Sequence, residues 1–278
     1  MSALPATMKA VEISAPGGPE VLKPVERPLP NIKAHEVLIK VKATGINGPD
    51  IMQRKGLYPA PAGASDLPGL EVSGEIVAKG ASVTRWSAGD LVVALTNGGG
   101  YAEYVAVDAE HCLSVPKGIS LLDAAGLPET FFTVWSNVFI GAGLKAGETF
   151  LVHGGAGGIG TTCIQLGKAF GAKVIATDSP ADRCRICSDL GADRVVDYRA
   201  EDFVEAVRSE GGANVILDIV GGANIEKNFK AASHDARIIQ LAFAAGSKVE
   251  INLMPVMLKR LTYTGSTLRT RPDAYKAR

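Results

Sequence analysis

The spacing of hydrophobic and polar positions along the chain changes near Leu121. Upstream of it, apolar residues at positions 37, 39 and 41 share one face and lysines at 40 and 42 lie on the other, which predicts a half-buried strand over 36–46. Short apolar runs bounded by glycine and proline predict further strands at 8–13, 71–78, 90–95 and 101–107. Short, irregular strands of this kind are typical of a small barrel-like β domain.

Downstream of Leu121, helical and strand patterns alternate. Two helices are predicted first, over residues 121–125 and 129–140. Apolar runs then predict strands at 149–153, 173–177, 194–196, 214–219, 237–241 and 261–264. The segments between them predict helices at 160–170, 181–190, 200–210 and 223–231. Because strands joined by crossover helices pair in parallel, we expect a doubly wound α/β sheet.

A glycine-rich turn follows the first strand of this second region. Gly155, Gly157 and Gly160 stand between the apolar run 149–153 and the next helix, and the second strand ends in Asp178. This is the order that a dinucleotide-binding βαβ unit needs, with a tight turn, close backbone approach to a pyrophosphate and a helix N-terminus facing the phosphates. The alternative is a glycine-rich turn without a ligand. The complete context favours a nicotinamide dinucleotide.

Composition and charge narrow the possible partners. Lys plus Arg and Asp plus Glu both total 29, so no net basic field attracts nucleic acid or an anionic membrane. No apolar run is long enough to cross a bilayer, and the first residues lack the blocks of a secretory signal. Four cysteines in 278 residues do not make a disulfide framework. We therefore expect a cytoplasmic protein without nucleic-acid or membrane partners.

Further motifs extend nearly from end to end of the chain: Ala15-Pro-Gly-Gly-Pro-Glu-Val-Leu22, Gly45-Ile-Asn-Gly-Pro-Asp-Ile-Met52, Gly69-Leu-Glu-Val-Ser-Gly74, Gly99-Gly-Tyr-Ala-Glu-Tyr-Val105 and Ala124-Ala-Gly-Leu-Pro-Glu-Thr130. With them the chain resembles the medium-chain dehydrogenase/reductase superfamily, and within it the zinc-independent NAD(P)H quinone oxidoreductases. The resemblance implies a GroES-like β-barrel domain over 1–127 and a Rossmann doubly wound sheet over 128–270. Residues 271–278 would begin a segment that returns to the first domain.

The resemblance also bears on the metal. Zinc alcohol dehydrogenases of this superfamily have Cys at the position of Asn47 and His at that of Leu70, and they carry a four-cysteine lobe that this chain lacks. Cys and His are the ligands that zinc prefers, so we expect no zinc. Without a Lewis acid, a quinone or other conjugated carbonyl is the expected hydride acceptor, because it gives a delocalised anion. By resemblance, Asn47 is a polar anchor and Tyr58 a substrate contact in the catalytic pocket; Tyr58 as a plain turn tyrosine is the alternative.

The cofactor residues also follow from the resemblance. They are expected at Thr133, Gly155, Gly157, Gly158, Ile159, Gly160, Asp178, Ser179, Arg183 and Tyr198. Quinone oxidoreductases of this type commonly take NADPH, and Arg183 and Tyr198 match the positions of their phosphate contacts. Asp178 argues for NADH, because an acid at this place accepts bonds from the ribose hydroxyls and repels a 2′-phosphate. We expect NADPH, with NADH as the alternative.

The expected activity is quinone reduction by NAD(P)H. Two alternatives stay open: an enone or enoyl-thioester reductase of the same superfamily, and a non-catalytic, crystallin-like NADPH-binding protein. The family pairs into homodimers through the edge strand that here runs from Leu261 to Thr264, so a homodimer is expected. Family members continue beyond the position of Arg278, and we expect an exposed apolar seam on the first domain where their return segment packs.

Overall fold

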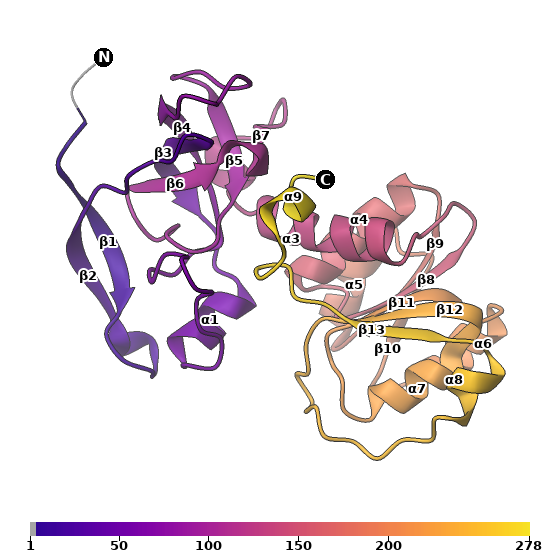
Figure 1. The fold of residues 1–278 in the computed structure, drawn as a ribbon. Helices are drawn as coiled ribbons and strands as arrows, with labels where there is room; N and C mark the ends of the chain where they lie inside the picture. The colour runs from indigo at the N-terminus through magenta and orange to yellow at the C-terminus, as the bar shows by residue number, and fades with distance from the viewer. Residues whose placement is uncertain (1–3) are drawn as a thin grey trace. The chain divides into compact units, whose positions relative to one another are not determined.

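The computed structural model describes residues 4–278, which form two compact units (Figure 1). The antiparallel unit comprises residues 4–132 together with 269–278, and the parallel unit comprises residues 133–268. The chain therefore leaves the first unit, completes the second and then contributes its last residues to the first. The boundary expected from the sequence pattern, after Leu127, lies slightly upstream of this division and stays a prediction.

The antiparallel unit is built on two sheets. A hairpin pairs β1 (Thr7–Ile13) with β2 (Leu22–Pro28). The second sheet has five strands in the order β6-β3-β4-β5-β7, all antiparallel. Their bounds are Glu36–Thr44 for β3, Glu71–Lys79 for β4, Leu91–Leu95 for β5, Tyr104–Asp108 for β6 and Cys112–Ser114 for β7. The strands predicted in this region are all present, and β2 and β7 are additional.

Short helices and two small cores complete this unit. The helical segments are η1 (Pro19–Val21), α1 (Gly48–Arg54), η2 (Ala109–His111), α2 (Leu121–Ala124) and α9 (Asp273–Lys276). Alternate residues of β3 bury Val37 and Ile39 against Ile76 and Val92, because a strand with one buried face presents every second side chain to it. Leu38, on the opposite face of β3, packs in a second cluster with residues of the hairpin.

The parallel unit contains one sheet of six parallel strands in the order β10-β9-β8-β11-β12-β13. In chain order this is 3-2-1-4-5-6, the strand order of the dinucleotide-binding doubly wound fold, so the predicted fold class is confirmed. The strands are β8 (Thr149–His153), β9 (Lys173–Asp178), β10 (Arg194–Asp197), β11 (Ala213–Asp218), β12 (Ala232–Gln240) and β13 (Thr262–Gly265).

Helices cover both faces of this sheet (Figure 1). They are α3 (Pro128–Val134, which begins in the antiparallel unit), the π-helical η3 (Trp135–Gly141), α4 (Gly158–Ala169), α5 (Ala181–Asp189), α6 (Phe203–Ser209), α7 (Asn224–Ala231) and α8 (Met254–Leu258). The central strands β8 and β11 each serve two cores: Leu151 and Ile216 pack with α6 and α7, whereas Phe150, Val152 and Leu217 pack with α4 and α5. The continuous apolar runs of these strands follow from burial on both sides.

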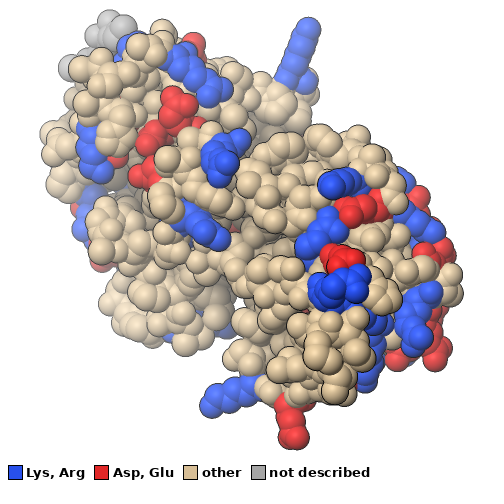
Figure 2. Space-filling model, turned by 45° about the vertical axis from the view of Figure 1, so that its right-hand side comes forward, with Lys and Arg blue, Asp and Glu red and all other residues tan. Residues whose placement is uncertain are grey.

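The surface carries both signs of charge. On the face seen in Figure 2, basic and acidic side chains lie close to one another, with uncharged surface between them. Within residues 4–278, no helix is both long and apolar enough to cross a membrane.

Candidate functional site

The glycine-rich turn leads from β8 directly into α4. Gly154 has a φ of 71°, a conformation that side chains rarely adopt, and Gly157 is the N-cap of the helix. The Gly157 N–H donates to Gly154 O at 3.0 Å, which closes the turn. Gly158, Ile159 and Gly160 form the first turn of α4, whose N–H groups have no partner within the helix. Such a helix N-terminus can bind the phosphates of a dinucleotide.

Two of the glycines are required by close packing. A Cβ on Gly160 would collide with Gly154 O and would lie 2.6 Å from Gly155 Cα. A Cβ on Gly155 would lie 2.7 Å from Cys187 Sγ and 2.9 Å from the Ala176 side chain. The helix therefore lies directly on the strand backbone, as the glycine spacing predicts.

Asp178, at the end of β9, holds the glycine turn and Arg183 together. Its Oδ2 accepts from Ala156 N at 2.8 Å and from Arg183 Nη2 at 3.1 Å, while Oδ1 accepts from Ser179 N at 2.8 Å and from Arg183 Nε at 2.7 Å. Burial alone would raise the pKa of Asp178, but these four donors lower it below its ordinary value. Asp178 is therefore an ionised carboxylate whose charge Arg183 balances.

Ser179 and Tyr198 lie beside this pair. The Ser179 side chain is buried, and its Oγ has no hydrogen-bond partner within the described residues. Tyr198 directly follows β10, donates its N–H to Asp178 O at 3.3 Å and leaves its ring exposed. Four predicted cofactor residues thus meet at the carboxyl ends of β9 and β10, the edge where doubly wound sheets bind ligands.

Thr133, the remaining predicted cofactor residue, lies in α3 and is buried. Its carbonyl oxygen accepts from Asn137 Nδ2 at 2.8 Å and from Ser136 Oγ at 3.2 Å. These bonds fix the backbone at the junction of α3 and η3.

In the antiparallel unit, Asn47 lies at the start of α1 and bonds to two acids. Its side-chain Nδ2 donates to Glu71 Oε1 at 2.7 Å, and its backbone N–H donates to Asp50 Oδ2 at 2.9 Å. Asp50 Oδ1 also accepts from Gly69 N at 2.9 Å. The amide of Asn47 is therefore held in one orientation by a buried carboxylate.

Glu71 is 2% exposed and receives two N–H groups, one from Asn47 and one from Glu129 N at 2.9 Å. Burial raises the pKa of Glu71, and these two donors act in the opposite direction. A Cβ on Gly45 would collide with the Glu71 carboxylate. The glycine at position 45 therefore leaves the space that this acid occupies.

Tyr58 follows α1, and the guanidinium of Arg269 lies over its ring at 5.6 Å from the ring centre. Arg269 is 7% exposed and donates to Asn97 O at 2.8 Å and to Gln53 Oε1 at 2.7 Å. Burial is the main reason that the pKa of Tyr58 is raised. The positive charge of Arg269 opposes this rise, and the charge of Glu129 adds to it. The hydroxyl of Tyr58 is thus a protonated donor at neutral pH.

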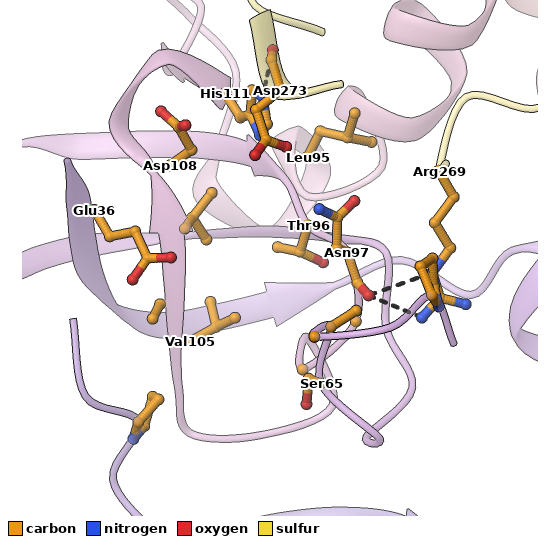
Figure 3. A pocket seen from close by; sticks show the side chains of 18 of the residues that line it. Glu36, Ser65, Leu95, Thr96, Asn97, Val105, Asp108, His111, Arg269 and Asp273 are labelled. Carbon is orange, nitrogen blue, oxygen red and sulfur yellow. Dashed lines mark hydrogen bonds between the residues drawn. The ribbon is translucent and has the colours of Figure 1, made fainter. Parts of the chain in front are cut away.

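Arg269 also lines a cavity of about 610 Å³ within the antiparallel unit (Figure 3). His111 Nε2 lies 3.1 Å from Asp273 O on its wall, and Lys276 Nζ donates to Asn97 Oδ1 at 2.8 Å. The last residues of the chain are therefore bonded to the turn that follows β5.

The residues at the positions of the zinc ligands do not fit a zinc site. Asn47 offers an amide that is already engaged by Glu71, and Leu70 offers a buried apolar side chain. Zinc prefers thiolate and imidazole ligands. Over residues 4–278, no three His, Cys, Asp or Glu side chains are grouped so that they could hold a metal ion.

The sequence reasoning did not identify four residues that shape these sites. Ala156 lies inside the predicted glycine turn, and Glu71 lies next to Leu70 in a motif that was recognised, so both had a local signal. Glu129 lies in the recognised motif 124–130 and so also had a local signal, although its contact with Glu71 joins distant parts of the chain. Arg269 had none, because its contact with Tyr58 comes from a distant part of the chain.

Two family matches cover most of the chain. Residues 33–117 match the family described as "Alcohol dehydrogenase GroES-like domain", and residues 158–277 match the one described as "Zinc-binding dehydrogenase". The first lies in the antiparallel unit and the second lies almost wholly in the parallel unit.

Curated proteins and solved structures agree with these matches. Human quinone oxidoreductase is 33% identical over 271 residues, which cover 94% of this chain and 80% of that protein. Escherichia coli quinone oxidoreductase complexed with NADPH superposes with a TM-score of 0.82 at 31% identity, covering 93% of this chain and 81% of that one. CurK enoyl reductase has a TM-score of 0.83 at 26% identity, over 95% and 81% of the chains. The chain therefore belongs to the quinone oxidoreductase family of the medium-chain dehydrogenases/reductases and is an NAD(P)H-dependent oxidoreductase.

Proposed function

We propose that this oxidoreductase transfers hydride from NADPH to a quinone or a similar small conjugated carbonyl, and that it does so without zinc. The observation that carries the proposal is the Asn47–Glu71 pair: an amide bonded to a buried carboxylate occupies the place of a metal ligand. Such a site can orient a carbonyl by hydrogen bonds but offers no Lewis acid. A conjugated carbonyl is the acceptor that such a site can serve, because its reduced anion is delocalised.

In this proposal, bound NADPH supplies the hydride. The N–H groups of residues 158–160 would bind its pyrophosphate, and Arg183 with the unpartnered Ser179 Oγ would bind its 2′-phosphate. Asn47 anchors the acceptor, and the Tyr58 hydroxyl donates a hydrogen bond to it. The NADPH-bound state of the Escherichia coli relative supports this choice of cofactor.

The test is NADPH oxidation measured with 1,4-benzoquinone, 9,10-phenanthrenequinone and 2-hexenal in parallel, each with and without EDTA. We expect both quinones to be reduced, hexenal to be reduced much more slowly, and EDTA to leave every rate unchanged. Loss of quinone reduction on metal removal would contradict the zinc-free mechanism.

The other two functions give different outcomes in the same assay. Reduction of hexenal but of neither quinone would favour an enone or enoyl-thioester reductase, the candidate that the likeness to CurK enoyl reductase supports. Tight NADPH binding with no turnover of any acceptor would favour a non-catalytic, crystallin-like role.

The proposal includes a homodimer formed through the edge of the parallel sheet. β13 is the last strand of that sheet, and all four of its residues are exposed. Helix α8, just before it, exposes Met254, Met257 and Leu258. An open strand edge beside apolar side chains supports pairing with a second copy.

A cytoplasmic location is also proposed. It is supported by the cysteines at positions 112, 163, 184 and 187, which are all free thiols. Free thiols persist where the compartment is reducing.

A further inference from the structure

Three acids of the antiparallel unit are linked to one another through Asn47 and the main chain of Glu129. Asp50 comes from α1, Glu71 from β4 and Glu129 from the second residue of α3. The backbone N–H of Glu129 donates to Glu71 Oε2, and the charges of Asp50 and Glu71 both act on the Glu129 carboxyl. Like charges in a poorly solvated site repel, so this arrangement disfavours the ionisation of all three acids at once.

Burial raises the pKa of all three acids, and hydrogen bonds oppose this rise at Asp50 and Glu71. Asp50 accepts the N–H groups of Asn47 and Gly69, and Arg269 adds a positive charge nearby. Glu71 accepts from Asn47 Nδ2 and Glu129 N, one donor on each oxygen. Donors of this kind stabilise a carboxylate.

Glu129 lacks this support. Within the described residues no hydrogen-bond donor reaches its carboxyl group, and its side chain remains partly exposed to solvent. Burial first, and then the charges of Glu71 and Asp50, raise its pKa to about 7. Its charge acts on Tyr58 in turn, which places the carboxyl near the phenol of the proposed substrate contact.

We propose that Glu129 is the general acid of the reaction, which delivers the proton that the carbonyl oxygen takes up after hydride transfer. This inference rests on the proposed quinone reduction. It assigns a role to a residue that was not among the expected site residues, and it makes Glu71 a positioning residue that holds the main chain of Glu129.

The step balances as follows. Hydride adds to the conjugated acceptor with its electron pair, which leaves a negative charge on the acceptor oxygen. The O–H bond of the Glu129 carboxyl breaks, and its proton forms the new O–H bond of the hydroquinone. Glu129 is left as a carboxylate, and water protonates it again through its exposed side. One proton is thus taken from solvent for each hydride transferred.

The activity test compares Glu129→Gln and Glu129→Asp with the wild type. We expect the wild-type kcat to be constant below about pH 7 and to fall at higher pH as the acid is lost. Glu129→Gln should lower kcat about 100-fold and remove this fall, whereas Glu129→Asp should keep kcat within about tenfold of the wild type. Glu75→Gln, which changes an exposed acid of β4, is the matched control and should leave both rate and pH profile unchanged.

A second readout does not depend on turnover. Infrared spectroscopy of the cofactor-free protein should show a protonated carboxyl band that disappears between about pH 6 and about pH 8 and is missing from Glu129→Gln. Equal melting temperatures and equal NADPH affinities would show that this variant is folded.

The outcomes separate the inference from the function on which it rests. Quinone reduction by Glu129→Gln at the wild-type rate and with the wild-type pH profile would overturn the role of Glu129 and leave the proposed function standing. Absence of the titrating band in the wild type would also overturn it. If the wild type binds NADPH but reduces no acceptor, the proposed function fails and the inference fails with it.

Discussion

Arg183 can bind one of two anions, the carboxylate of Asp178 or a phosphate of the cofactor. In the structure two of its donor atoms, Nε and Nη2, bond to Asp178, and its side chain is 43% exposed. A guanidinium has donors on several edges, so it can keep one bond to Asp178 while it binds a phosphate. Arg183 therefore neutralises the charge of Asp178, which would otherwise repel a 2′-phosphate.

We predict that Arg183→Met raises the KM for NADPH about tenfold, which corresponds to about 1.4 kcal/mol, and the KM for NADH by less than about threefold. The reason is that only NADPH carries the phosphate. Steady-state kinetics with both cofactors measures this, with Arg185→Met, an exposed arginine of the same helix, as the control. A strong NADH preference that Asp178→Ala abolishes would contradict the assignment.

Most of the residues proposed to bind the cofactor had a local signal because they are close along the chain. The glycines and Asp178 lie within one βαβ unit and Arg183 lies in the helix that follows it, so their spacing carries the geometry. The bond between Glu71 and Glu129 joins residues 58 positions apart, and the stacking of Arg269 on Tyr58 joins still more distant ones. Such contacts depend on how strands pair and where the chain returns, which no local pattern encodes.

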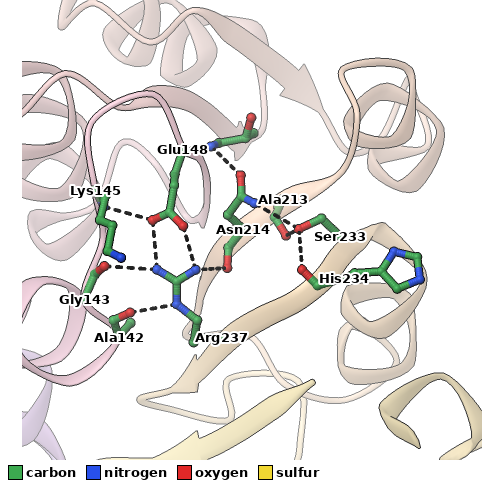
Figure 4. Close-up of polar contacts among 10 residues, drawn as sticks. Ala142, Gly143, Lys145, Glu148, Ala213, Asn214, Ser233, His234 and Arg237 are labelled. Carbon is green, nitrogen blue, oxygen red and sulfur yellow. Dashed lines mark hydrogen bonds and ion pairs between the residues drawn. The ribbon is translucent and has the colours of Figure 1, made fainter. Parts of the chain in front are cut away.

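At the scale of elements, Arg237 connects β12 to the turn that precedes β8 (Figure 4). Its guanidinium donates to both oxygens of Glu148 at 2.8 Å and also to the carbonyl oxygens of Ala142, Gly143 and Asn214. The bond to Arg237 is the main reason that the pKa of Glu148 lies below its ordinary value.

We predict that Arg237→Met destabilises the parallel unit by about 1–3 kcal/mol at neutral pH. Because the pKa of Glu148 is lowered by folding, the pair stabilises the protein above the unfolded pKa, and this stabilisation is lost as pH falls through the folded pKa. The difference in the free energy of unfolding between wild type and variant should therefore become smaller below about pH 4. Urea unfolding at several pH values measures this difference. A difference that does not change with pH would contradict the role of Glu148. Arg199→Met, an exposed arginine, serves as the control.

The elements that the sequence did not predict have physical explanations. β2 contains Pro24 and Pro28 and reads as a loop, yet it forms a strand because it is an edge strand that pairs with β1 on one side, where proline is tolerated. Helix α1 begins with Gly48 and Pro49, which read as a turn, although proline is well suited to a first helical turn. Long apolar strands such as β8 were predicted because both of their faces are buried.

At the scale of the whole molecule, the edge strand β13 and helix α8 bear on the state of assembly. We predict a dimer by size-exclusion chromatography with light scattering. The double substitution Met257→Asp with Leu258→Asp should give a monomer, because charges would replace two exposed apolar side chains beside the edge strand.

The control for assembly is Leu122→Asp, which places the same charge on an equally exposed leucine of the antiparallel unit. It should remain a dimer. Retention of the dimer by the Met257 and Leu258 variant, or its loss in the control, would show that a different surface is used.

The return of residues 269–278 to the antiparallel unit has a consequence for synthesis on the ribosome. Arg269 and Lys276 are both buried there, and both bond to Asn97. A nascent chain has Asn97 long before it has either partner, whereas the whole of the parallel unit is translated without interruption between them. The antiparallel unit is therefore the first to be synthesised in part, but it is completed only after the parallel unit. During translation, the turn after β5 lacks its bonds to Arg269 and Lys276 until the whole parallel sheet has been synthesised.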